Sequence, residues 1–167
     1  MVLFAASVFI AAAQGAGRAQ ASPGITVLTA AALQQQIARF DQPATVVHVW
    51  ATWCAPCREE FPRLMRFQRD YADRGLRLIL ISADPPDKSG EVARYLQEQG
   101  AASPSYLIDN PNSDFINTLS TNWSGALPAT FFFQGSGRLA QWWEGAATDE
   151  MYKQAAAKLL PPAEKRR

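Results

Sequence analysis

Two apolar, strand-like segments enclose one long helical segment between residues 44 and 82, and this pattern limits the fold more than any other part of the chain. Ala44–Trp50 and Leu76–Ser82 are rich in β-branched and aromatic residues, as expected of strands that are buried on both faces. Residues 57–74 carry apolar side chains at helical spacing, with Pro62 as an expected kink and Gly75 as the stop. A strand, a helix and a strand in this order form a right-handed unit with parallel strands, so the sequence predicts an α/β fold.

The other segments extend this unit on both sides. Their patterns predict, in chain order, a strand over 24–28, a helix from a Thr29 cap to about residue 40, a loop over 84–90, a helix over 91–99, a strand over 105–109, a helix capped by Ser113 and ending near 119, a β-hairpin over 129–144 that turns at 135–137, and a helix from a Thr148 cap to about residue 160. No internal repeat and no low-complexity segment interrupts them.

Cys54 and Cys57, the two cysteines of the chain, lie at the turn between the first buried strand and the long helix. A helix N-terminus stabilises negative charge through its unpaired N–H groups and its dipole, which favours a thiolate there. A structural role is less favoured, because a disulfide that closes so short a loop stabilises little and a structural zinc needs four ligands, whereas the chain offers two cysteines and one histidine, His48. The spacing therefore indicates a redox-active Cys54–Cys57 disulfide, with no metal and no other cofactor.

The first 21 residues have the composition of an export signal. Residues 2–13 form an apolar run, and Ala19-Gln20-Ala21 has the form of a signal-peptidase site. No Lys or Arg precedes the run, so a short N-terminal membrane anchor is the alternative, although the run is shorter than the roughly 20 apolar residues that span a bilayer. We expect one domain over residues 22–162, followed by a basic tail over 163–167, in a protein located in the periplasm or otherwise exported.

The charge is balanced and indicates no charged partner. The formal net charge is +1, and without the expected signal the chain loses one basic residue, Arg18, and becomes neutral. This gives no indication of binding to nucleic acid or to an anionic membrane surface. We expect a monomer.

Two segments carry a resemblance to a known family: Val47-His-Val-Trp-Ala-Thr-Trp-Cys-Ala-Pro-Cys57 and, ahead of the hairpin, Leu127-Pro128-Ala-Thr130. With them the chain resembles the thioredoxin fold and, within it, the exported thiol:disulfide oxidoreductases of the TlpA and ResA type. The resemblance covers about residues 24–160, including an inserted segment over 84–119. It implies a thioredoxin-like three-layer sandwich, in which helices cover both faces of a mixed central sheet. It also implies a cis peptide bond before Pro128, facing the cysteines, which leaves the backbone of Leu127 free to pair with an extended substrate.

The position of the cysteines, together with this resemblance, predicts their roles. Cys54, at the exposed end of the helix, would attack a substrate disulfide, and the more buried Cys57 would resolve the mixed disulfide. The intervening Ala55 and Pro56 would tune the redox potential and border the substrate, and their identity favours a reductant. Trp53 would offer the substrate an exposed apolar platform.

The resolving thiol must lose a proton, and the sequence offers two candidate acceptors. His48 stands six residues before Cys54, where thioredoxin has a buried acid; it could accept the proton or donate one hydrogen bond in a core. Asp84 follows the second buried strand and could be a carboxylate base with a raised pKa. Alternatively, it could cap the turn before Pro85-Pro86.

These residues together predict an exported protein disulfide reductase that acts on disulfide-containing proteins. By resemblance, a membrane thiol-reductant partner would re-reduce it, and cytochrome c maturation is the setting that the resemblance suggests. A Cu(I)-binding metallochaperone on the same fold is the alternative, because thiolates and a nearby histidine, His48, are soft ligands; tight one-to-one Cu(I) uptake would favour it. A peroxidase is less favoured, because the Pro-x-x-x-Thr-x-x-Cys pattern is absent around Cys54.

Overall fold

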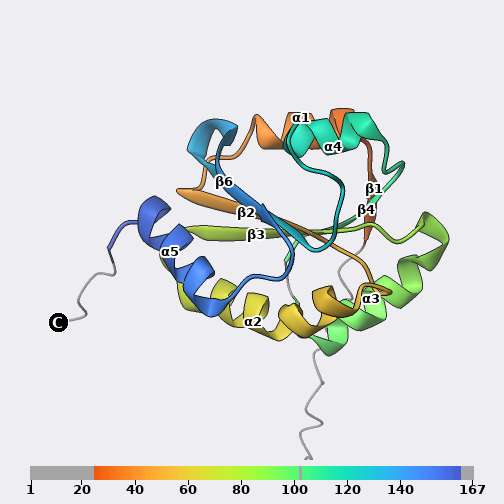
Figure 1. The fold of residues 1–167 in the computed structure, drawn as a ribbon, viewed down its shortest axis with the longest axis horizontal. Helices are drawn as coiled ribbons and strands as arrows, with labels where there is room; N and C mark the ends of the chain where they lie inside the picture. Colours follow the sequence, from red (N-terminus) through yellow and green to blue (C-terminus); the bar gives the residue numbers. More distant parts are fainter. Residues whose placement is uncertain (1–24, 102, 163–167) are drawn as a thin grey trace, which may run out of the picture.

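Six strands form one mixed sheet in the order β1-β4-β3-β2-β5-β6 (Figure 1). In this computed structural model, which describes residues 25–101 and 103–162, the strands are β1 Thr26–Leu28, β2 Ala44–Trp50, β3 Leu76–Ser82, β4 Ser105–Ile108, β5 Ala129–Gln134 and β6 Arg138–Glu144. The pairs β1–β4, β4–β3 and β3–β2 are parallel, whereas β2–β5 and β5–β6 are antiparallel. The expected export signal and basic tail lie outside the described residues.

Among the described residues, five α-helices cover the two faces of this sheet. They are α1 Ala30–Ile37, α2 Ala55–Ala72, α3 Ser89–Glu98, α4 Ser113–Leu119 and α5 Asp149–Leu159. Helices α1 and α4 lie on one face and α2, α3 and α5 on the other, which gives the expected three layers (Figure 1). Within the described part of the chain, no helix is both long and apolar enough to cross a membrane.

Strand β2 lies in the middle of the sheet, and all seven of its residues are buried. It contributes side chains to both hydrophobic cores. Alternate side chains point to opposite faces of a strand. Accordingly Val46 and Trp50 join the core under α2, α3 and α5, whereas Val47 and Val49 join the core under α1 and α4. His48 therefore points to the same face as Trp50, toward helix α2, and this places it below the cysteine-bearing turn.

Several element boundaries differ from the sequence-based expectation. Helix α2 begins at Ala55 rather than at Cys57, because Cys54 is its N-cap and a proline is well tolerated in the first helical turn. The helix then continues through Pro62. The residue that caps α4 is Asn112 and not Ser113: the Asn112 side chain accepts a hydrogen bond from the Phe115 N–H at 3.1 Å.

The loop after β3 is also shorter than expected, since the 3₁₀ turn Pro86–Lys88 leads directly into α3. The caps at Thr29 and Thr148 are where the sequence predicts them. Their hydroxyl groups accept hydrogen bonds from the N–H groups of Ala32 and Met151 at 3.2 and 3.3 Å.

Candidate active site

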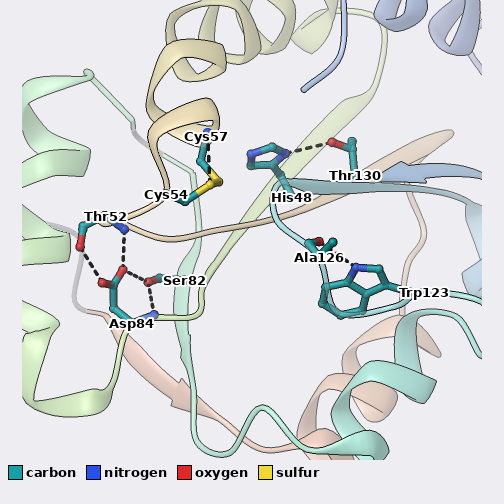
Figure 2. The surroundings of a disulfide bond; sticks show 9 residues. All are labelled: His48, Thr52, Cys54, Cys57, Ser82, Asp84, Trp123, Ala126 and Thr130. Atoms are coloured by element: carbon teal, nitrogen blue, oxygen red, sulfur yellow. Dashed lines mark hydrogen bonds between the residues drawn. A yellow bond between two sulfur atoms is a disulfide. The ribbon is translucent and has the colours of Figure 1, made fainter. Parts of the chain in front are cut away.

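The cysteine pair sits where β2 ends and α2 begins, and the two sulfurs form a disulfide with a Cα–Cα distance of 5.3 Å (Figure 2). The Cys54 sulfur accepts a hydrogen bond from the Cys57 N–H at 3.3 Å. Cys54 is therefore the N-cap residue of α2, and its sulfur makes the capping contact. Once reduced, a thiolate at this place is stabilised by the helix N-terminus. Cys54 is 6% exposed and Cys57 is fully buried, so an incoming substrate reaches Cys54.

An apolar cavity of about 570 Å³ borders the exposed side of Cys54. It is lined by side chains that include Trp53, Pro56, Phe115, Trp123 and Leu127, and no charged side chain is among its lining residues in the described chain. Trp53 is 67% exposed, which is unusual for such a large apolar group. An apolar cavity at a reactive sulfur fits an apolar segment of a substrate.

The segment that closes this cavity on the other side ends at a cis peptide bond between Leu127 and Pro128. The Trp123 indole N–H donates a hydrogen bond to the Ala126 carbonyl at 3.0 Å and thereby fixes the turn ahead of that bond (Figure 2). The antiparallel ladder between β2 and β5 begins at Ala129, so the backbone of Leu127 lies outside it. Leu127 itself lines the cavity.

Asp84 is buried near the disulfide, and both of its carboxylate oxygens accept hydrogen bonds (Figure 2). The donors are the backbone N–H and the hydroxyl of Thr52, at 2.8 and 2.6 Å, and the hydroxyl of Ser82 at 2.6 Å. These contacts fix the turn just before the cysteines to the end of β3. This geometry favours a structural role for Asp84 over the role of a base. The turn that its carboxylate fixes is the one at Thr52, and not the Pro85-Pro86 turn.

His48 is fully buried, and its Nδ1 atom lies 3.0 Å from the hydroxyl oxygen of Thr130. Its ring packs edge-on against Phe61, with 6.4 Å between the ring centroids, and its Nε2 atom has no hydrogen-bond partner. Burial lowers the pKa of His48 to about 3, so the imidazole is neutral at pH 7. Holding the proton of a thiol as a buried imidazolium ion is therefore strongly disfavoured.

Glu60 is a further candidate for the proton acceptor, and the sequence patterns did not indicate it. It lies one helical turn after Cys57, is fully buried, and accepts hydrogen bonds on Oε1 from the Tyr152 hydroxyl at 2.6 Å and the Ala147 N–H at 2.9 Å. Its Oε2 atom has no partner, and burial raises the pKa of this carboxyl, an effect opposed by the two hydrogen bonds and by Arg63. A carboxyl in these surroundings can hold a proton at a higher pH than an ordinary glutamate. The available sequence indication was an acidic residue in the apolar stripe between Cys57 and Phe61.

The side chains that could bind a soft metal are the two cysteines, once reduced, and His48. One ring nitrogen of His48 is already engaged by Thr130. Across residues 25–101 and 103–162, no group of three or more His, Cys, Asp or Glu side chains is arranged as a metal site.

Comparison with known proteins agrees with this arrangement. The model of the AhpC/TSA family matches residues 19–142, about three quarters of the chain. The chain belongs to this family. Among its curated relatives, the thiol-disulfide oxidoreductase ResA of Halalkalibacterium halodurans is 22% identical over 77% of this chain and 69% of its own length. The thiol:disulfide interchange protein HelX of Rhodobacter capsulatus is 30% identical over 72% of this chain and 62% of its own length.

Solved structures show the same fold at lower identity. A DsbF homologue from Corynebacterium diphtheriae has a TM-score of 0.62 at 21% identity, over 74% of this chain and 76% of its own. A DsbE-type thiol:disulfide interchange protein from Chlorobium tepidum has a TM-score of 0.60 at 18% identity, over 75% of this chain and 83% of its own. These structures confirm the predicted thioredoxin-like α/β fold. The relatives named above confirm the ResA-type resemblance and the enzyme class of thiol:disulfide oxidoreductase.

Proposed function

We propose that this protein is an exported protein disulfide reductase, in which Cys54 attacks the substrate and Cys57 resolves the mixed disulfide. The observation that carries this proposal is the unequal placement of the two sulfurs at one helix N-terminus. Cys54 borders an open apolar cavity, and Cys57 is fully buried one turn behind it.

The reaction oxidises the two cysteines and reduces one disulfide. The Cys54 thiolate attacks one sulfur of the substrate disulfide, and the other substrate sulfur leaves as a thiolate that takes a proton from water. The Cys57 thiolate then attacks the Cys54 sulfur, and the bond between Cys54 and the substrate breaks. The second substrate sulfur leaves and is protonated, and the enzyme ends in the disulfide form seen in Figure 2.

The surroundings of Cys54 support a protein substrate with apolar residues next to its disulfide. Trp53, Pro56 and Leu127 line the cavity, and Ala55, the residue before Pro56, is exposed to solvent. Pairing of an extended substrate with the backbone of Leu127 would align the substrate disulfide with Cys54. Pro128 holds the turn from which that backbone is presented.

The proposal also includes the direction of the reaction, the compartment in which the protein acts, and the partner that re-reduces it. The signal-like first 21 residues support export, and an oxidising compartment offers no soluble pool of reductant. A membrane thiol-reductant partner would therefore return the Cys54–Cys57 disulfide to the dithiol form. The relationship to proteins named ResA and HelX supports cytochrome c maturation as the process served.

Two measurements test this function. With a peptide disulfide flanked by aromatic residues, Cys57→Ser should accumulate a mixed disulfide through Cys54, whereas Cys54→Ser should accumulate none. The reduction potential, measured against glutathione, should lie nearer thioredoxin's roughly −270 mV than the roughly −120 mV of the oxidant DsbA. A value near that of DsbA would contradict the assignment as a reductase.

A further inference from the structure

The apolar cavity beside Cys54 extends from the surface into the core. Among its lining residues, Trp53 and Ala126 are exposed to solvent, whereas Phe115 and Trp123 are at most 6% exposed and belong to the core under α1 and α4. A hollow of about 570 Å³ is unusual there, because protein interiors are close-packed and hold few voids larger than a water molecule. The cavity therefore has the form of a ligand site rather than of a shallow surface groove.

The lining of the cavity offers a ligand very few polar partners. No lining side chain in the described chain is charged, and the polar side-chain atoms are the Cys54 sulfur and the indole N–H groups of Trp53 and Trp123. The Trp123 N–H already donates to the Ala126 carbonyl (Figure 2). A charged group in the cavity would lose its hydration without gaining a partner, which is costly. The cavity is therefore suited to an uncharged ligand.

Charged side chains gather on the other side of Trp53. A second hollow there, of about 410 Å³, has Trp53 in its lining together with two arginines and two glutamates, namely Arg58, Arg94, Glu91 and Glu98. Trp53 is thus a partition between an apolar and a charged hollow. Within the described residues, Cys54 lines the apolar hollow and not the charged one, so the reactive sulfur faces the side that selects for uncharged groups.

The size and walls of the cavity fit an aromatic ring with part of its attached chain. A dry apolar cavity of roughly 150 Å³ is enough to hold benzene, and this cavity is several times larger. Trp53, Phe115 and Trp123 provide aromatic walls, against which another ring can pack edge-on or offset. Because Cys54 is part of the same lining, a ring held there can be bonded to the sulfur that Cys54 attacks.

We propose that the cavity binds an uncharged aromatic group attached to the sulfur of a low-molecular-mass disulfide, so that the protein reduces small aryl disulfides in addition to protein disulfides. This inference rests on the function proposed above. Cys54 attacks the sulfur that carries the ring in the cavity, and the other half of the disulfide leaves. Cys57 then attacks the Cys54 sulfur, and the second half leaves from the cavity. The two protein thiols lose two electrons and two protons in total, and two molecules of aryl thiol are released.

The experiment compares two aromatic disulfides of different charge in a stopped-flow instrument. Dithiodipyridine is uncharged at pH 7, whereas Ellman's reagent carries a carboxylate on each ring. Each is mixed in a stoichiometric amount with reduced full-length protein. The first release of coloured thiol reports attack by Cys54, and the second reports resolution by Cys57.

Dividing each first-phase rate constant by the rate constant with mercaptoethanol corrects for the different intrinsic reactivities of the two disulfides. We expect the corrected rate to be at least about tenfold higher for dithiodipyridine, because the carboxylates of Ellman's reagent would be unpaired in the cavity.

Variants that fill the cavity should remove this preference. Ala126→Leu adds an apolar side chain from the surface side, and Ile116→Phe adds one from α4 and serves if the first variant folds poorly. Either should slow the first phase with dithiodipyridine about tenfold and leave Ellman's reagent within about threefold of the wild type. Ala140→Leu places the same extra side chain at an exposed position of β6, outside the cavity, and should change neither rate.

Binding to the cavity can also be measured without a redox step. Naphthalene is uncharged, aromatic and free of sulfur, so its binding to the disulfide form of the protein tests the cavity alone. Because Trp53 and Trp123 line the cavity, their fluorescence should change saturably with naphthalene concentration. We expect this change in the wild type and in Ala140→Leu, and its loss in Ala126→Leu.

The outcomes distinguish this inference from the proposed function. Equal corrected rates for the two disulfides, equal slowing of both by Ala126→Leu, or no saturable binding of naphthalene would overturn the aromatic site and leave the reductase function standing. Naphthalene binding without any reaction of the reduced protein with either disulfide would overturn the proposed function, and the reduction of small disulfides with it.

Discussion

The two sides of the Cys54–Cys57 disulfide have opposite chemical character. On the outer side, Cys54 borders a cavity of about 570 Å³ with no charged side chain among its described lining residues. On the inner side, four polar side chains are buried in two hydrogen-bonded pairs, His48 with Thr130 and Tyr152 with Glu60.

This difference separates substrate binding from proton handling. The outer side has few polar groups to satisfy, so shape and apolar contact decide what binds there. On the inner side a buried polar atom without a partner is costly, and Nε2 of His48 and Oε2 of Glu60 both lack one. Changes on the outer side should therefore alter the affinity for substrate, and changes on the inner side should alter the resolving step and the response to pH.

The largest expected effect is on the acid side of the stability profile, and it arises from His48. Its pKa is about 3 in the folded protein and about 6.5 when unfolded. The unfolded chain therefore binds a proton that the folded one rejects, and His48 removes about 1.4 kcal/mol of unfolding free energy for each pH unit between 6.5 and 3. His48→Asn should lack this loss, which urea unfolding at pH 7, 5 and 4 would measure.

Comparing the wild type with His48→Asn separates the contribution of His48 to the pH dependence of stability from that of the carboxylates, because the carboxylates titrate in both proteins. The difference in stability should be constant above pH 7 and should grow in favour of the variant as the pH falls. Parallel profiles for the two proteins would show that His48 is accessible to protons in the folded state.

The next largest effect concerns the resolving step. Glu60→Gln keeps an oxygen that can accept from Tyr152 and Ala147 but removes the group that can take a proton, so resolution by Cys57 should slow about 100-fold. Glu59→Gln, at the exposed neighbouring position, is the control and should change neither phase. Equal rates for Glu60→Gln and the wild type would exclude Glu60 as an acceptor.

The sequence was sufficient for the fold, because its decisive features are local. The continuous apolar runs of β2 and β3 and the helix between them predict the parallel unit. The string from Val47 to Cys57, with Pro128 ahead of the hairpin, predicts the family. Helix ends were less well predicted. Asn112 and Ser113 are both good capping residues, and only the backbone geometry selects Asn112.

The inner side of the site could be predicted only in part. His48 was identifiable by its spacing from Cys54, but its partner Thr130 lies 82 residues away and meets it only through the register of β2 and β5. Glu60 stands in the apolar stripe of α2, but only the packed structure shows that its hydrogen-bond partner is Tyr152 of α5, 92 residues away. Contacts between residues so distant in sequence depend on tertiary packing, which local patterns do not encode.

A smaller effect is expected on the outer side. Trp53→Ala should raise KM about tenfold for a peptide disulfide with aromatic neighbours, because a large aromatic side chain at a binding surface is often a dominant contact. The reaction with a small disulfide such as oxidised dithiothreitol should be unchanged. Val27→Ala alters an exposed apolar residue on β1, outside the cavity, and is the control. An increase in KM for both disulfides would show that Trp53 acts on Cys54 itself.

The smallest effect concerns Asp84. Thr52→Val removes one of its hydrogen bonds and should lower the unfolding free energy by about 1 kcal/mol, with both redox phases within about threefold of the wild type. Thr118→Val, which removes a hydroxyl that donates within its own helix, is the control. A selective slowing of the resolving phase in Thr52→Val would instead support Asp84 as the base.

The most direct test of the account is to find which sulfur reacts first. Reduced protein is treated with a limiting amount of iodoacetamide at pH 7, and the labelled cysteine is identified by peptide mapping with mass spectrometry. Because Cys54 caps the helix beside the cavity and Cys57 is fully buried, we expect the label on Cys54 in at least about tenfold excess. Preferential labelling of Cys57, or equal labelling of both, would contradict the division between an outer, attacking side and an inner, resolving side.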